Sequence, residues 1–99
     1  MLEINDQTIF ALSPDATLKN ILNEKFFLLD KRHGQQYNLT EMEYALLTMI
    51  RDRVRFKEIR ETICREYDAE ESQVDSDVKE YMQSLFEHGL ATTAESVGT

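Results

Sequence analysis

The chain has 99 residues and a formal net charge of −8, and 30% of its residues are charged. This length predicts one small domain over residues 1–99 with a thin hydrophobic core. The acidic balance disfavours a nucleic acid partner, because the phosphates would be repelled, and no run approaches the roughly 20 apolar residues of a membrane span.

The first 22 residues give a weak structural signal. Residues 1–14 alternate only faintly between polar and apolar, so they form either a frayed arm or a short strand before the turn signal at residues 13–15. Residues 16–22 are predicted as a first strand, although Leu18, Ile21 and Leu22 also fit one helical turn. The structured core is expected to begin at about residue 16.

A β-hairpin is predicted over residues 25–39. Phe26–Leu29 is a continuous apolar run, and Tyr37 and Leu39 alternate with polar neighbours, as in a half-buried strand. Gly34 gives the turn its backbone freedom. Together with residues 16–22, the hairpin predicts a three-stranded antiparallel sheet whose edge strand is Gln36–Leu39.

Three helices follow the strands. Thr40 and Glu43 have the spacing of a capping box, and apolar residues recur at helical intervals over approximately residues 41–53, 56–67 and 70–88. Gly89 is typical of a helix C-terminus, and residues 91–99 are expected to form a loose tail. Strands followed by helices indicate an α+β domain with a winged-helix-like set of elements.

No catalytic or metal site is predicted. His33 and His88 lack nucleophiles or further ligands at a recognisable spacing, and Cys64 is expected to pack as a small hydrophobic residue. Ser76 follows Asp75 as in carrier proteins that hold a phosphopantetheine arm, but it lies inside a helix and is followed by Asp77. We expect no cofactor.

Peptide binding is the function that these observations leave. An edge strand has unpaired backbone groups that can accept a strand from another chain. The main apolar stripe of the third helix consists of Val74, Val78, Tyr81 and Leu85. The helix offers a second wall, because Met82 and Phe86 lie beside this stripe and form a strip with Asp75 and Lys79. Alternatively, Met82 and Phe86 only widen the contact of this helix with the core, or pack on the sheet.

An ordered set of motifs resembles the start and end of PqqD-like proteins over roughly residues 16–91. The first half of the likeness is carried by Phe27-Leu28-Leu29-Asp30, by His33 to Thr40, and by Ala45-Leu46-Leu47. The second half is carried by Phe56-Lys57-Glu58-Ile59, Glu66-Tyr67-Asp68, Asp77-Val78, Tyr81-Met82, Leu85 and Gly89-Leu90. The chain departs from the family at Asn38-Leu39, whose order is swapped, and at the connector 52–55, where the usual Asp-Gly is missing.

The resemblance implies three strands followed by three helices and a non-catalytic role in making ribosomally synthesised, modified peptides. Such proteins bind the leader of the precursor peptide and present it to a radical-SAM enzyme or a leader peptidase. The leader adds a strand beside the third strand and lies against the third helix. Carried over to this chain, the peptide-binding residues are Gln36, Tyr37, Asn38, Leu39, Asp75, Val78, Lys79, Met82 and Phe86.

The sequence also bears on DNA binding, on dimer formation and on the cellular compartment. A winged-helix regulator that binds DNA would need a basic third helix, but Lys79 is the only cation in residues 70–87, against six carboxylates. The free sheet edge also permits a homodimer. A single cysteine and the absence of a signal peptide pattern predict a protein of the reducing cytoplasm.

Overall fold

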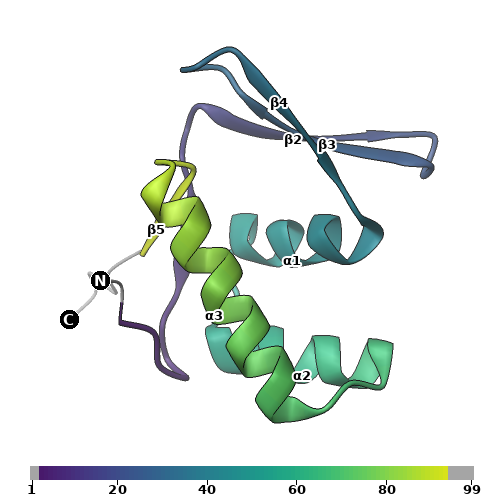
Figure 1. The fold of residues 1–99 in the computed structure, drawn as a ribbon, viewed down its shortest axis with the longest axis vertical. Coiled ribbons are helices and arrows are strands. Elements are labelled where there is room, and N and C mark those ends of the chain that lie inside the picture. The colour runs from purple at the N-terminus through teal and green to yellow at the C-terminus, as the bar shows by residue number, and fades with distance from the viewer. Residues whose placement is uncertain (1–2, 94–99) are drawn as a thin grey trace.

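The computed structural model describes residues 3–93 and places a small sheet on top of three helices (Figure 1). The elements in chain order are β1 (Phe10–Leu12), β2 (Ala16–Ile21), β3 (Lys25–Asp30), β4 (Gln35–Leu39), α1 (Glu41–Arg51), α2 (Phe56–Tyr67), α3 (Glu71–Glu87) and β5 (Ala91–Thr93). The predicted α+β class, with a three-stranded antiparallel sheet and three helices, is confirmed.

The sheet has the strand order β2-β3-β4, and both neighbouring pairs are antiparallel. Leu28 lies opposite Tyr37, and Phe26 lies opposite Leu39. Tyr37 and Leu39 are therefore on the face that covers the helices, while Gln36 and Asn38 are exposed. Within the described residues, β4 pairs with β3 alone, so the prediction that Gln36–Leu39 is an edge strand is confirmed.

A second, two-stranded sheet joins the two ends of the described chain. Phe10 of β1 lies opposite Thr93 of β5, and Leu12 lies opposite Ala91. The first segment therefore contains a short strand, and the prediction of a loose tail is wrong for residues 91–93. Residues 94–99 of the predicted tail lie outside the described residues.

The three helices agree closely with the predicted ranges, and α2 begins and ends where it was expected. Gly89 has a φ of 71°, the left-handed conformation that ends a helix at little steric cost, and Leu90 behind it is buried. Phe56 and Met82 are fully buried in the core between the helices. Met82 therefore belongs to the core, whereas Phe86 is 41% exposed.

No helix within residues 3–93 is both long enough and apolar enough to cross a membrane.

Candidate functional site

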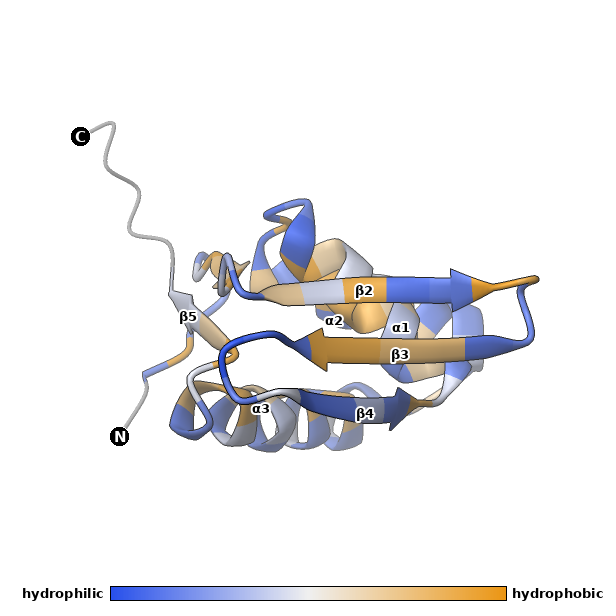
Figure 2. Ribbon diagram, turned by 90° about the horizontal axis from the view of Figure 1, so that it is seen from above, coloured by the Kyte–Doolittle hydropathy of each residue, from blue (hydrophilic) through white to orange (hydrophobic). Residues whose placement is uncertain are grey.

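A hollow of about 170 Å³ lies between the edge strand β4 and the C-terminal half of α3. Viewed from above, α3 runs beneath β4, and β2 forms the opposite edge of the sheet (Figure 2). We call this space the strand–helix hollow. It is lined by Leu28, Tyr37, Asn38, Leu39, Glu43, Tyr81, Ser84, Leu85, His88 and Leu90.

The turn before β4 is fixed by the buried carboxylate of Asp30. Its Oδ1 accepts hydrogen bonds from the backbone N–H groups of Arg32 and His33, at 3.1 and 3.3 Å. Nδ1 of His33 lies 2.7 Å from Oδ2, and this hydrogen bond lowers the pKa of Asp30. Gly34 follows with a φ of 64°. These contacts determine where β4 starts and so hold the hollow's outer wall in place.

The other end of β4 is fixed by the predicted capping box, which is confirmed. Oγ1 of Thr40 accepts a hydrogen bond from the backbone N–H of Glu43 at 3.1 Å, and Oε1 of Glu43 accepts one from the backbone N–H of Thr40 at 2.9 Å. Glu43 is thereby held at the end of the hollow opposite His88. Burial and the negative charge of Glu43 raise the pKa of Tyr81 to about 12, so its phenol remains neutral and can donate a hydrogen bond.

His88 lies at the other end of the hollow with a defined tautomer. Its Nδ1 is 2.7 Å from the backbone carbonyl oxygen of Ser84. A carbonyl oxygen only accepts hydrogen bonds, so Nδ1 carries the proton and Nε2 is the acceptor in the neutral ring. The hollow therefore has an apolar floor with a phenol, a carboxylate and an imidazole at its rim.

The strand residues predicted from the sequence lie at this hollow. Tyr37, Asn38 and Leu39 line it, and the exposed Gln36 lies on the same edge strand with its side chain on the opposite face from Tyr37. Whether these residues contact a peptide remains a prediction.

The predicted residues of α3 lie on other sides of the helix. Val78 and Met82 are buried in the core, and Phe86 is exposed without lining the hollow. Asp75 and Lys79 lie in a wide, open depression between α3 and residues 3–5. The reason is helical geometry, because each residue of a helix is rotated by about 100° from the one before it. The residues that face β4 are therefore Tyr81, Ser84, Leu85 and His88.

Sequence reasoning did not recognise Tyr81, Ser84 and Leu85 of α3, with His88 that caps the helix, as one wall. They recur at intervals of three or four residues, which is the signal that could have grouped them. Tyr81 and Leu85 were assigned to the main apolar stripe, and His88 was considered only as a catalytic or metal residue. The direction in which this face points depends on the packing of α3 under the sheet.

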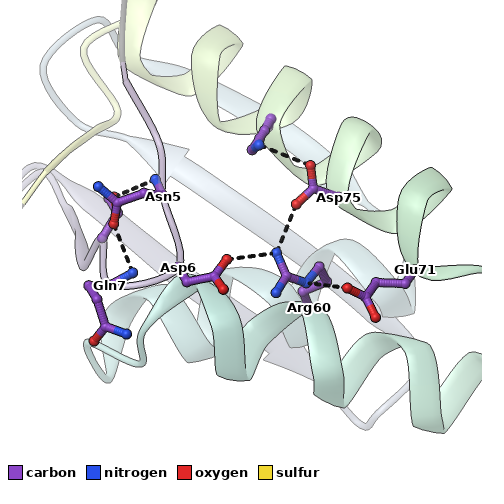
Figure 3. Close-up of polar contacts among 8 residues, drawn as sticks. Asn5, Asp6, Gln7, Arg60, Glu71 and Asp75 are labelled. Carbon is purple, nitrogen blue, oxygen red and sulfur yellow. Dashed lines mark hydrogen bonds and ion pairs between the residues drawn. The ribbon is translucent and has the colours of Figure 1, made fainter.

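An ion-pair cluster around Arg60 on α2 was also missed (Figure 3). Nη1 of Arg60 donates to Oδ1 of Asp6 at 3.0 Å and to Oδ1 of Asp75 at 2.9 Å, and Nε lies 3.6 Å from Oε1 of Glu71. Nζ of Lys79 is 2.9 Å from the other oxygen of Asp75. The cluster ties the N-terminal segment to α2 and α3, because the almost fully buried guanidinium contacts all three.

Replacing Arg60 by methionine is expected to lower the free energy of unfolding at pH 7 by about 2 kcal/mol, because hydrogen bonds to charged groups are lost. Hydrogen bonds from Arg60 and Lys79 lower the pKa values of Asp6 and Asp75 below the usual 3.8. The two ionised carboxylates therefore stabilise the fold above about pH 4, and this stabilisation is lost as the pH falls through their lowered pKa values.

Urea unfolding at pH 7 and pH 3 measures this effect. The difference in the free energy of unfolding between Arg60→Met and the unmodified chain should be smaller at pH 3 than at pH 7. The matched variant Arg65→Met, at an exposed position of the same helix, should have nearly the stability of the unmodified chain at both pH values. An equal gap at both pH values would contradict the assigned role of the two carboxylates.

The other candidates from the sequence take up ordinary positions. Cys64 is half-buried and packs against the core, and Ser76 is exposed on α3. Within residues 3–93, no group of three or more histidine, cysteine, aspartate or glutamate side chains is arranged to hold a metal ion.

Two solved structures share this fold. One is described as lasso peptide synthetase B1 complexed with the leader peptide, with a TM-score of 0.74 and 23% identity, covering 84% of this chain and 96% of that chain. The other is TbiB1 in complex with the TbiA(beta) leader peptide, with a TM-score of 0.75 and 20% identity, covering 90% and 99%. At these identities the likeness concerns the fold alone.

Comparisons at the level of sequence give the family. No curated protein matches the chain with significant similarity. The sequence profile described as coenzyme PQQ synthesis protein D (PqqD) matches residues 25–91, about two thirds of the chain. This matched region includes β3, β4 and all three helices, and so contains both walls of the strand–helix hollow. The chain therefore belongs to the PqqD family.

Proposed function

We propose that this chain is a non-catalytic peptide-recognition protein, which binds the leader of a ribosomally synthesised precursor peptide and presents it to a modifying enzyme. The observation that carries the proposal is the edge strand β4, which pairs on one side only within the described residues and borders the strand–helix hollow. Membership of the PqqD family and the leader peptides named in the two similar structures support it.

The proposed binding mode is strand addition. The leader lies antiparallel to β4, continuing the antiparallel order of the sheet, and backbone hydrogen bonds supply much of the affinity. Alternate side chains of the leader point toward α3, where the hollow takes one large apolar side chain. The neutral phenol of Tyr81 and the imidazole of His88 are placed to orient polar groups of the leader.

The proposed partners are the leader peptide and a modifying enzyme, either a radical-SAM protein or a leader peptidase. No cofactor is needed for this role. We also propose that the three helices and the sheet are a winged-helix-like arrangement with the strands moved to the front, and that the protein works in the cytoplasm. A homodimer through the edge of β4 would compete with the leader for the same backbone groups.

DNA binding is the less supported alternative. The exposed positions of α3 include Glu71, Asp77, Glu80 and Glu87, which would repel phosphates in a groove. A gel shift at low salt that showed tight binding of duplex DNA would favour the alternative.

An amide-shift titration tests the proposal. The probe is a synthetic peptide with the sequence of a candidate precursor leader. We expect a dissociation constant at or below about 1 μM, which is roughly −8 kcal/mol. The largest shifts should occur in Gln35–Leu39 and Tyr81–His88. Shifts confined to residues 51–65, or no binding by the leader, would contradict the proposed function.

A further inference from the structure

A second hollow of about 240 Å³ lies between α1, α2 and α3. We call it the interhelical hollow. Its lining is mostly apolar and consists of Met42, Glu43, Leu46, Ile63, Ala69, Gln73, Val74, Asp77, Val78 and Tyr81. Met42, which lines the hollow, is 39% exposed, so the hollow is open to solvent on this side. The space is large enough for one bulky side chain.

The two hollows share Glu43 and Tyr81, so they adjoin at the end of β4. β4 ends at Leu39, and α1 begins two residues later at Glu41. A guest strand antiparallel to β4 enters beside Leu39 and leaves beside Gln35. The part of the guest that precedes its paired segment therefore lies next to the interhelical hollow.

The rim of the interhelical hollow is acidic. Glu43 and Asp77 line it, and none of its described lining residues is cationic. One oxygen of Glu43 accepts the hydrogen bond from the backbone of Thr40, and Oδ1 of Asp77 accepts one from Nε2 of Gln73 at 2.9 Å. Each of these hydrogen bonds orients its carboxylate and uses one of the two oxygens. A basic side chain fits this rim better than an acidic one.

We propose that the interhelical hollow is a second anchor site for the same leader. It takes a large apolar side chain that lies N-terminal to the segment paired with β4, and a neighbouring lysine or arginine of the leader faces Glu43 and Asp77. This inference rests on the proposed function and adds to it a requirement on the leader. Recognition then depends on two anchors at a fixed spacing, which excludes peptides that can only supply a strand.

Filling the hollow from the protein side tests the inference. Ala69 is half-buried and lines the hollow, and Ala69→Phe places a phenyl ring in the proposed space. Binding of the synthetic leader should weaken at least tenfold. A leader truncated just before its β4-paired segment should bind the unmodified chain at least tenfold more weakly than the whole leader. The truncated leader should bind Ala69→Phe and the unmodified chain with the same affinity.

A second variant and a control accompany this test. Asp77→Asn removes one rim charge without adding bulk, and it should weaken binding of the whole leader about threefold at low salt, with a smaller effect at high salt. Glu66→Phe adds the same phenyl ring at an exposed position of α2 outside the hollow, and it should leave binding unchanged. If Ala69→Phe does not fold, the truncation and Asp77→Asn still decide the outcome.

The outcomes separate this inference from the proposed function. Equal binding of whole and truncated leaders, with amide shifts still centred on Gln36–Leu39, overturns the second anchor and leaves strand addition intact. Failure of the leader to bind the unmodified chain overturns both. The second anchor is also overturned if Ala69→Phe weakens binding of the truncated leader as much as it weakens binding of the whole leader. The substitution would then act on the strand site.

Discussion

Ser84→Trp is expected to weaken binding of the leader peptide about a hundredfold, which corresponds to about 2.7 kcal/mol. Ser84 is exposed and lines the strand–helix hollow, and its backbone carbonyl oxygen accepts hydrogen bonds from Nδ1 and from the backbone N–H of His88. An indole at this position would occupy the hollow and stand beside the open edge of β4. Titration calorimetry with the synthetic leader measures the effect.

Ser76→Trp is the matched control for this substitution. Ser76 is also an exposed serine of α3, but it lies on the side of the helix that faces residues 3–5. The control should bind the leader with unchanged affinity, and circular dichroism should show that both variants are folded. Equal affinities for Ser84→Trp and the unmodified chain would remove the hollow from the binding mode.

Phe56→Ala is expected to lower the free energy of unfolding by about 3–5 kcal/mol. Phe56 is fully buried and meets Phe10 edge-on, with ring centroids 6.4 Å apart. The guanidinium of Arg60 and the ammonium of Lys79 lie 5.4 and 5.7 Å from its ring centre. One ring thus joins β1, α2 and α3, and truncating it leaves a cavity among all three.

This loss is a large share of the roughly 5–10 kcal/mol expected for a domain of this size. Urea unfolding measures it, and Phe86→Ala makes the same chemical change at a side chain that is 41% exposed, with an expected cost below about 1 kcal/mol. Similar costs for the two variants would mean that Phe56 does not organise the core as described.

Local patterns in the sequence were sufficient for most of the secondary structure. The hairpin around Gly34, the capping box of Thr40 and Glu43, and the end of α3 at Gly89 are each specified by residues only a few positions apart. The edge position of β4 also followed from the sequence, because consecutive strands tend to pair and only three were available.

Contacts between distant residues required the tertiary structure. β1 and β5 are three residues each and carry too little pattern to be predicted, since each is a strand only because the other pairs with it. The sequence alone gives no sign that Arg60 is buried, because its partners Asp6 and Asp75 lie 54 and 15 positions away and meet it only in the folded chain. The wall of α3 was decided in the same way: helical periodicity shows which residues share a face, but only the packing under the sheet decides that Tyr81 and Ser84 face β4 while Met82 enters the core.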